Sequence, residues 1–313
     1  MLLALTTNPA IDRTLVVPGF RHGEVTRATD RRDAAGGKGL NVARVAHTLG
    51  TPVRACAPLG GDTGRAIADL AAAEGLAGAW FWMERGVSRV CLLISDLQTQ
   101  DTLVINEPGP LMQPSDWHGF AQLVEEQSKA AHAVSFSGSL MPGVSIADYS
   151  ALVQALLQTQ QSVYIDISGD PLRATLDLPI ALLKVNAPEL GTALGITIST
   201  RADAVAAAQA VRSRGHGPRA VVVTLGAAGA IACDDTGGWH ASTPAIQLVS
   251  PVGSGDAVLA GIASQLLIGT SLNSALLTGV AAGAANAQTL GGGIVDPSEV
   301  RRLVALSTLV RIA

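Results

Sequence analysis

The chain has 313 residues, of which 48% are hydrophobic and 15% charged, so it can bury a sizeable core and is not expected to be disordered. Its formal net charge of −4 and pI of about 5.8 argue against a protein that binds nucleic acid or an anionic membrane. Three widely spaced cysteines have no metal-ligand spacing and indicate reduced thiols. The N-terminus does not resemble a signal peptide, and no apolar run reaches 18 residues. We therefore expect a soluble, cytoplasmic protein.

Short apolar runs of strand length recur along the chain, with helical patterns between most of them. The expected strands are Leu2–Leu5, Val53–Ala57, Ala133–Phe136, Val163–Ile167, Leu182–Val185 and Ala220–Leu225. The expected helices include Asn41–Leu49 and Arg65–Ala73, and Ser145 and Thr200 have the pattern of N-caps for two later ones. Continuous apolar strands that alternate with helices predict an α/β fold with a mostly parallel sheet covered on both faces.

Two stretches interrupt this alternation and contain strands without intervening helices. The expected strands in Ile11–Ala34 and Ala79–Ile105 are Thr14–Val17, Glu24–Thr29, Arg89–Ser95 and Thr102–Ile105. Such strands could pair into a small separate sheet above the carboxyl ends of the main strands, where open α/β folds bind their ligands. We expect a single domain over residues 1–313, with lid strands inserted from about 11–34 and 79–105.

The run Gly253-Ser254-Gly255-Asp256 directly precedes a long apolar helical pattern. Glycines let backbone amides turn toward one point, and the positive end of the helix completes an anion site. Asp256 stands beside this site, where the helix dipole favours its ionised form, and could accept a proton from a hydroxyl that attacks a phosphoryl group. A plain helix cap explains the run equally well at this point.

A second glycine-rich run, Gly36-Gly37-Lys38-Gly39, lacks the spacing of a Walker A loop but offers close backbone approach and one cation. Asn41 follows it, and Asp12 comes soon after the first strand, where a carboxylate can accept two sugar hydroxyls. Arg89, in an otherwise apolar stretch, could pair with a phosphate. Each has an ordinary alternative. Lys38 could be a solvated lysine on a tight turn, Asp12 an ordinary turn aspartate, and Arg89 part of a surface salt bridge.

Together these runs resemble the PfkB (ribokinase-like) sugar kinase family over nearly the whole chain, and its hexose-phosphate branch in particular. The matching runs are Thr7–Asp12, Ala35–Arg44, Ser137–Leu140, Asn186–Glu189, Thr224–Ala230 and the loop at 253–256, in the family's order and spacing. The resemblance implies a ribokinase-like fold with a small β-sheet lid, ATP and Mg²⁺ as cosubstrate and cofactor, and a homodimer formed through the lid.

The resemblance also implies roles for particular residues. Asp256 would be the catalytic base, and the amides of Gly253, Ser254 and Gly255 the anion hole. The acceptor sugar would be held by Asp12, Gly37, Lys38, Asn41 and Ser139, with Lys38 and Arg89 on its existing phosphate. Asn186 and Glu189 would organise Mg²⁺ and the ATP phosphates through water. The nucleotide would lie along Asp166, Ser168, Lys184, Asn186, Thr224, Gly226 and Gly229, with Asn286 near the adenine.

A charged binding group at Lys38, together with Arg89, indicates a sugar that already carries a phosphate. The segment Ile105–Pro110 resembles 1-phosphofructokinases, so fructose 1-phosphate, phosphorylated at its 6-hydroxyl, is the first choice. Tagatose 6-phosphate and fructose 6-phosphate remain open, because these ketoses are nearly symmetric and one hydrogen bond can decide between them.

Two other classes of protein are weighed against a kinase. A nicotinamide-dependent oxidoreductase would carry Gly-x-Gly-x-x-Gly after the first strand, and Asn8-Pro9-Ala10 stands there instead. A catalytically silent sugar-phosphate sensor would be expected to lose Asp256 or its glycines, and all of them are present.

Overall fold

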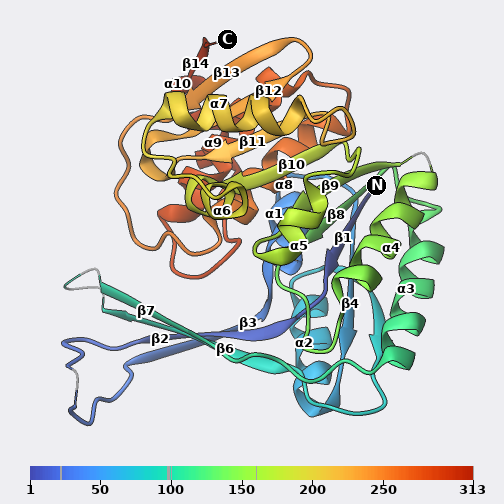
Figure 1. Ribbon diagram of the computed structural model, residues 1–313. Coiled ribbons are helices and arrows are strands. Elements are labelled where there is room, and N and C mark those ends of the chain that lie inside the picture. Colours follow the sequence, from blue (N-terminus) through green and yellow to red (C-terminus); the bar gives the residue numbers. More distant parts are fainter. Residues whose placement is uncertain (22, 97–98, 100, 160, 313) are drawn as a thin grey trace.

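A ten-stranded sheet forms the body of the protein, and a separate four-stranded sheet extends away from it (Figure 1). The computed structural model describes residues 1–21, 23–96, 99, 101–159 and 161–312. The order in the large sheet is β14-β13-β12-β11-β10-β9-β8-β1-β4-β5. The run from β11 to β5 is parallel, whereas β12, β13 and β14 continue the sheet in antiparallel fashion. The predicted mostly parallel sheet is therefore confirmed.

The strands of the large sheet are β1 (Leu2–Thr6), β4 (Val53–Leu59), β5 (Ala77–Trp82), β8 (Ala133–Ser137), β9 (Ser162–Asp166), β10 (Leu182–Asn186), β11 (Val221–Thr224), β12 (Ala230–Asp234), β13 (Gly237–Ser242) and β14 (Thr308–Arg311). The helices are α1 (Lys38–Thr48), α2 (Gly61–Ala73), α3 (Pro114–Ser128), α4 (Ile146–Gln158), α5 (Asp170–Thr175), α6 (Ala187–Leu194), α7 (Arg201–Arg212), α8 (Ser254–Leu266), α9 (Leu272–Ala287) and α10 (Pro297–Leu306). None of the helices in the described part of the chain has the length and apolarity needed to cross a membrane.

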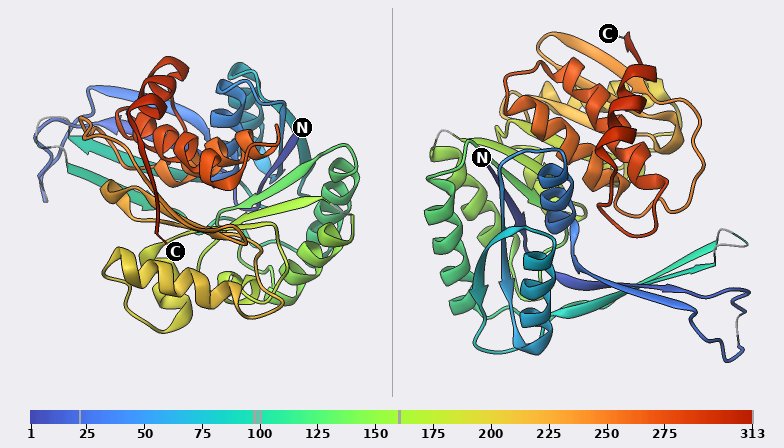
Figure 2. Two further views of the ribbon diagram at one scale, coloured as in Figure 1. Left: turned by 90° about the horizontal axis from the view of Figure 1, so that it is seen from above. Right: turned by 180° about the vertical axis from the view of Figure 1, so that it is seen from behind.

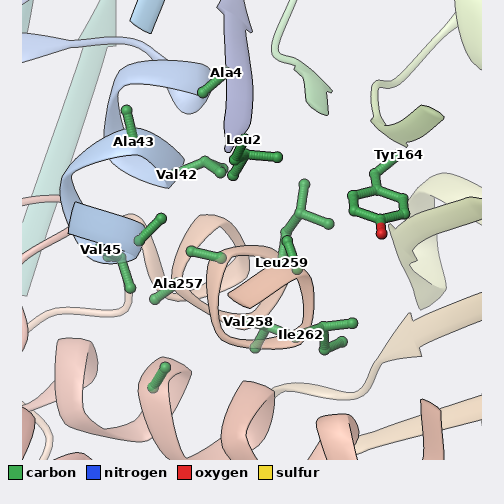
Figure 3. Packing of buried hydrophobic residues seen from close by; sticks show 14 of the residues in the cluster. Leu2, Ala4, Val42, Ala43, Val45, Tyr164, Ala257, Val258, Leu259 and Ile262 are labelled. Atoms are coloured by element: carbon green, nitrogen blue, oxygen red, sulfur yellow. The ribbon is translucent and has the colours of Figure 1, made fainter. Parts of the chain in front are cut away.

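The helices cover both faces of the large sheet, as Figure 2 shows from above. Helices α1, α2, α8, α9 and α10 pack on one face and α3 to α7 on the other. On the first face, Val42 and Val45 of α1 share one cluster with Leu2 of β1 and Leu259 of α8 (Figure 3). Helices α1 and α8 therefore pack together over the central strand, and their N-termini carry the two glycine-rich runs.

The smaller sheet has the order β3-β2-β6-β7 and corresponds to the predicted lid. Its strands are β2 (Ala10–Val16), β3 (Asp30–Gly36), β6 (Arg89–Asp96) and β7 (Asp101–Asn106). The prediction of a strand at Glu24–Thr29 is wrong, because the chain has no regular structure there and the strand that pairs with β2 begins at Asp30. The pairing is supported by Asp33, whose carboxylate binds Arg13 across the strands at 2.8 Å. The strand that forms instead, Asp30–Gly36, is an edge strand rich in charged residues, which a search for apolar strands does not find.

The helix starts at Ser145 and Thr200 form as the sequence predicts, and a third cap forms at Asn186. Ser145 Oγ accepts the backbone N–H of Asp148 at 3.0 Å, and Thr200 forms a capping box with Asp203. Asn186 forms another with Glu189: its Oδ1 accepts the Glu189 N–H at 2.8 Å, and Glu189 Oε2 accepts the Asn186 N–H at 3.2 Å. The turn over Leu225–Gly229 joins β11 to β12 and contains a short 3₁₀ segment.

Candidate active site

Polar side chains line up along the carboxyl edge of the parallel strands. The strand register places Thr6 opposite Ser137, and Ser137 opposite Asp166. Farther along the sheet, Asn186 lies opposite Thr224. Each of these residues ends its strand, which is where open α/β sheets bind ligands. The sequence therefore brings segments from across the chain to one edge.

The first glycine-rich run brings the start of α1 into close contact with β1. Gly37, the residue before α1, has φ of 106°, and a Cβ there would come within 2.6 Å of Thr6 Cγ2. At Gly39 a Cβ would lie 2.1 Å from the carbonyl oxygen of Leu5. Only glycine fits this approach, so Lys38 and Asn41 are held over the end of the central strand.

The second glycine-rich run forms the start of α8. Gly253 has φ of 78°, and a Cβ there would lie 2.6 Å from the Gly292 Cα, so the loop packs directly on the turn at 291–293. Behind the loop, Asn286 Nδ2 donates to the Val252 carbonyl at 2.7 Å and to Ser254 Oγ at 3.1 Å. Ser254 therefore has a function that an alanine would lack, because it ties the loop to α9.

Asp256 lies in the first turn of α8 and is buried. Asn41 of α1 donates from Nδ2 to Asp256 Oδ2 at 2.8 Å. Burial raises the pKa of Asp256 to about 6, although Lys38, Lys184 and the Asn41 hydrogen bond each act to lower it. The effect of burial on the pKa is thus larger than that of the helix dipole, which the sequence had suggested would keep Asp256 ionised. A pKa of about 6 suits a general base that works near neutral pH.

Two lysines and a carboxylate form a charged cluster beside this loop, in which Asp166 and Lys184 are buried and Lys38 is partly exposed. Asp166 accepts from Lys184 Nζ at 2.7 Å and from Lys38 Nζ at 3.1 Å, and Lys38 Nζ lies 3.9 Å from Glu189. Burial acts to raise the pKa of Asp166, but the two ammonium groups hold it below its usual value. A Cβ on Gly255 would lie 2.6 Å from Lys184 Nζ, so this ammonium group packs against the glycine loop.

The lid contributes a second charged region. Asp12 lies within β2, and burial raises its pKa, while Arg44 and Arg89 act to lower it. Arg89 begins β6 and donates to the Asn8 carbonyl at 2.9 Å and to the Glu107 carbonyl at 2.8 Å. Positive charge is therefore present at two places, at the lid and at the glycine loop.

A cavity of about 620 Å³ contains most of the predicted site residues. Those lining it are Asp12, Gly37, Lys38, Asn41, Arg89, Ser139, Ser168, Lys184, Asn186, Glu189, Thr224, Gly226, Gly253, Ser254, Gly255 and Asp256. A neighbouring cavity of about 930 Å³ shares Asn186, Thr224 and Gly226 with it and continues past Arg201 and His240. One cavity thus leads into the other along the ends of β10 and β11.

Three predicted site residues do not line these cavities. Asp166 is buried within the lysine cluster, Gly229 packs against β13, and Asn286 is fully buried with its amide bonded to the glycine loop and to the Ile294 N–H. The sequence reasoning also missed lining residues. Thr6, Asn8 and Ser137 line the first cavity, and among the described residues each has a buried side-chain oxygen without a hydrogen-bond partner. Their position at or just after strand ends was the available signal.

A glycine loop at a helix start, a buried carboxylate and a cavity lined by both acidic and basic side chains, at the carboxyl edge of a mostly parallel α/β sheet, are the features of a small-molecule kinase. Residues 4–299 match the pfkB family carbohydrate kinase. The chain therefore belongs to the PfkB family of carbohydrate kinases.

Individual relatives agree with this assignment. The chain is 34% identical over 282 residues, covering 90% of this chain and 88% of the other, to the 1-phosphofructokinase of Haloferax volcanii. Among solved structures it is similar to the tetrameric inhibited form of phosphofructokinase-2 from Escherichia coli, with a TM-score of 0.90 at 27% identity over 97% of this chain and 98% of the other. The same enzyme in complex with fructose-6-phosphate gives a TM-score of 0.88 at 26% identity, with the same coverage.

Proposed function

We propose that this protein transfers the γ-phosphoryl group of ATP to a ketohexose monophosphate, with Asp256 as the general base. The observation that carries the proposal is the buried Asp256 carboxylate at the glycine loop, inside a cavity with two separate cationic positions. A sugar that already carries one phosphate and receives a second needs positive charge at two places. Arg89 at the lid is proposed to bind the phosphate that the sugar already carries. Lys38, beside Asp166 and Glu189, could bind either that phosphate or the phosphoryl group that is transferred.

The chain's own residues divide the reaction among them. Asn41 holds one oxygen of Asp256, and the other oxygen is left to accept the proton of the attacking hydroxyl. The amides at the start of α8 and the Lys184 ammonium group face the negative charge that develops on the transferred group. The second cavity, which passes Thr224 and Gly226, is proposed to hold the nucleotide.

Magnesium is proposed as the metal that accompanies ATP. The described residues contain no cluster of three or more acidic, histidine or cysteine side chains that could hold a metal ion. One carboxylate at Glu189 and one amide at Asn186 fit an ion that keeps much of its water and takes further ligands from phosphates. Such an ion would neutralise charge on the phosphates when it is bound.

Fructose 1-phosphate, phosphorylated at its 6-hydroxyl, is the proposed acceptor. The name of the Haloferax relative supports this choice, and the fructose-6-phosphate complex of the Escherichia coli enzyme supports a competing one. Tagatose 6-phosphate would fit a cavity of the same size. The choice among them depends on contacts to individual hydroxyls.

An ADP-release assay with these three ketose phosphates tests the function. We expect the highest kcat/KM with fructose 1-phosphate and a bisphosphate product, which ³¹P NMR would identify. Fastest turnover of another ketose would reassign the substrate. Binding of a ketose phosphate without ADP release from any of them would indicate a sensor instead of a kinase.

The pH dependence of kcat/KM tests the base. Asp256 must be ionised to accept a proton, and its pKa is raised to about 6, so kcat/KM should fall as the pH drops through about 6. Measurement at constant ionic strength with saturating ATP gives the acid limb. A limb in the ordinary carboxyl range would contradict the assignment of Asp256.

A homodimer formed through the lid is also proposed. Leu103 and Ile105 on β7 are 41% and 46% exposed, and burying such an edge strand protects it from wrong pairing. The tetrameric Escherichia coli structure shows that a similar fold assembles. Sedimentation velocity of this protein would give its own oligomeric state.

A further inference from the structure

Arg44 is a buried arginine in the first glycine-rich motif to which the proposed reaction assigns no role. It lies on α1, one turn after Asn41, and only 9% of it is exposed. A buried guanidinium group is stable only when its donors are paired. Its partners therefore reveal what it holds in place.

All five N–H groups of Arg44 are used. Nε and Nη2 bind the two carboxylate oxygens of Glu74 at 2.7 and 3.2 Å, and Nη2 also donates to the Ala35 carbonyl. Nη1 donates to Asn41 Oδ1 at 2.9 Å and to the Gly292 carbonyl at 3.0 Å. One side chain thus joins α1, the C-terminus of α2, the end of lid strand β3 and the 291–293 turn.

The bond to Asn41 decides which way the Asn41 amide faces. With Oδ1 bound to the guanidinium group, Nδ2 is left to donate to Asp256. The reversed amide would place its oxygen against the Asp256 carboxylate and its NH₂ against Arg44, so both contacts would become repulsive. Because Arg44 can only donate, it keeps the donor side of Asn41 on the proposed base.

The bond to Gly292 acts on the glycine loop. The turn at 291–293 packs against both the glycine loop and Asn41. A Cβ on Gly253 would lie 2.6 Å from Gly292 Cα, and a Cβ on Gly293 would lie 2.9 Å from Asn41 Cα. Arg44 holds this turn through its hydrogen bond to the Gly292 carbonyl. The anion loop and the base therefore depend on the same guanidinium group.

We propose that Arg44 is a positioning residue that orients Asn41 toward Asp256 and fixes the 291–293 turn beneath the glycine loop. The proposal rests on the proposed role of Asp256 in catalysis. Other charged groups act on the same two residues: Lys38 of α1, Asp166 of β9 and Lys184 of β10 act on Asp256, whereas Glu74 and Asp12 face Arg44. None of these replaces the donor that fixes Asn41.

Arg44→Lys is the principal test, because lysine can keep the ion pair with Glu74 but has no second nitrogen for Asn41. Loss of an oriented hydrogen bond to a carboxylate should raise the pKa of Asp256 by about one unit. The acid limb of kcat/KM should move to higher pH by the same amount, so kcat/KM should be about tenfold lower than in the wild type at pH values below the limb. Arg44→Met should show at least the same shift, so that two independent variants carry the test.

Glu74→Gln is the matched control. It weakens the ion pair and should lower stability, but it leaves the Arg44 donors to Asn41 and Gly292 in place. Its acid limb should therefore coincide with that of the wild type. An equal shift in Glu74→Gln would show that the limb responds to charge or stability, and would overturn the positioning role.

An infrared titration of the Asp256 carboxyl separates this inference from the proposed reaction, because it requires no turnover. The carboxyl band is assigned by subtraction of the Asp256→Asn spectrum. An upward shift of its midpoint in Arg44→Lys, with an unchanged kinetic limb, would support the positioning role and remove Asp256 as the base. A midpoint equal to that of the wild type would overturn the inference, whatever the kinetics show.

Discussion

Asp256→Asn should lower kcat by at least about 10² while ATP affinity stays close to that of the wild type. Asparagine has nearly the shape of aspartate and can still accept from Asn41 Nδ2, so the geometry of the site should survive. The amide cannot take a proton from the attacking hydroxyl. Steady-state kinetics at saturating sugar phosphate, combined with calorimetric titration of ATP, measures both quantities.

Asp116→Asn is the matched control for this variant. Asp116 is also buried and also lies in the first turn of a helix, α3. Its carboxylate accepts the Glu84 N–H at 3.4 Å, and it does not line either cavity of the site. Its kcat should equal that of the wild type. Turnover of Asp256→Asn at the wild-type rate would show that the hydroxyl loses its proton elsewhere.

Lys184→Met should lower the free energy of unfolding by about 3 kcal/mol at neutral pH, which is more than we expect for any other substitution proposed for this protein. It removes the shorter of the two ammonium contacts of the buried Asp166 and keeps the longer one, to Lys38. Methionine fills a similar volume, so the loss would come from the uncompensated charge. Chemical denaturation monitored by circular dichroism gives the value.

The pH dependence of this loss identifies its cause. In the wild type the pKa of Asp166 lies below its usual value, so its contribution to stability is complete above the ordinary carboxyl pKa and disappears only in stronger acid. Without Lys184 the pKa should rise, because burial then meets less opposition. The deficit of Lys184→Met should therefore shrink as the pH falls, and a deficit that did not change with pH would indicate lost packing.

An exposed lysine provides the comparison. Lys129 forms a surface ion pair with Glu126 at 2.6 Å, three residues earlier in the chain. Such pairs contribute little in water, so Lys129→Met should leave the unfolding transition where it is in the wild type. An equal loss in both variants would mean that the lysine stem, and not the buried charge, matters.

The sequence predicted the α/β sheet and much of the site because both depend on local patterns. Apolar strands, glycines before helices and capping residues such as Ser145 each act within a few residues, and the structure confirms these. The capping box at Asn186 forms for the same reason. The strand ends then gather the motifs at one edge.

The features that the sequence did not reveal depend on long-range partners. Strand β3 is joined to β2 by the ion pair between Asp33 and Arg13, which a search for apolar alternation cannot find. The placement of Asn286 behind the glycine loop and the role of Arg44 need the packing of α1, α8 and α9. The raised pKa of Asp256 likewise follows from burial in the folded chain and not from its position at a helix start.

The contact between Asn41 and Asp256 also has a consequence for the order of events during synthesis. The two residues are 215 positions apart, and the turn at 291–293 that packs on both comes later still. Chains emerge from the ribosome N-terminus first, so the central strands and the lid can form well before Asp256 and its glycine loop exist. Helix α1 must wait with part of its apolar face uncovered until α8 arrives. A nascent chain of this protein therefore exposes that apolar surface until α8 has been made, and during that time the surface is open to aggregation.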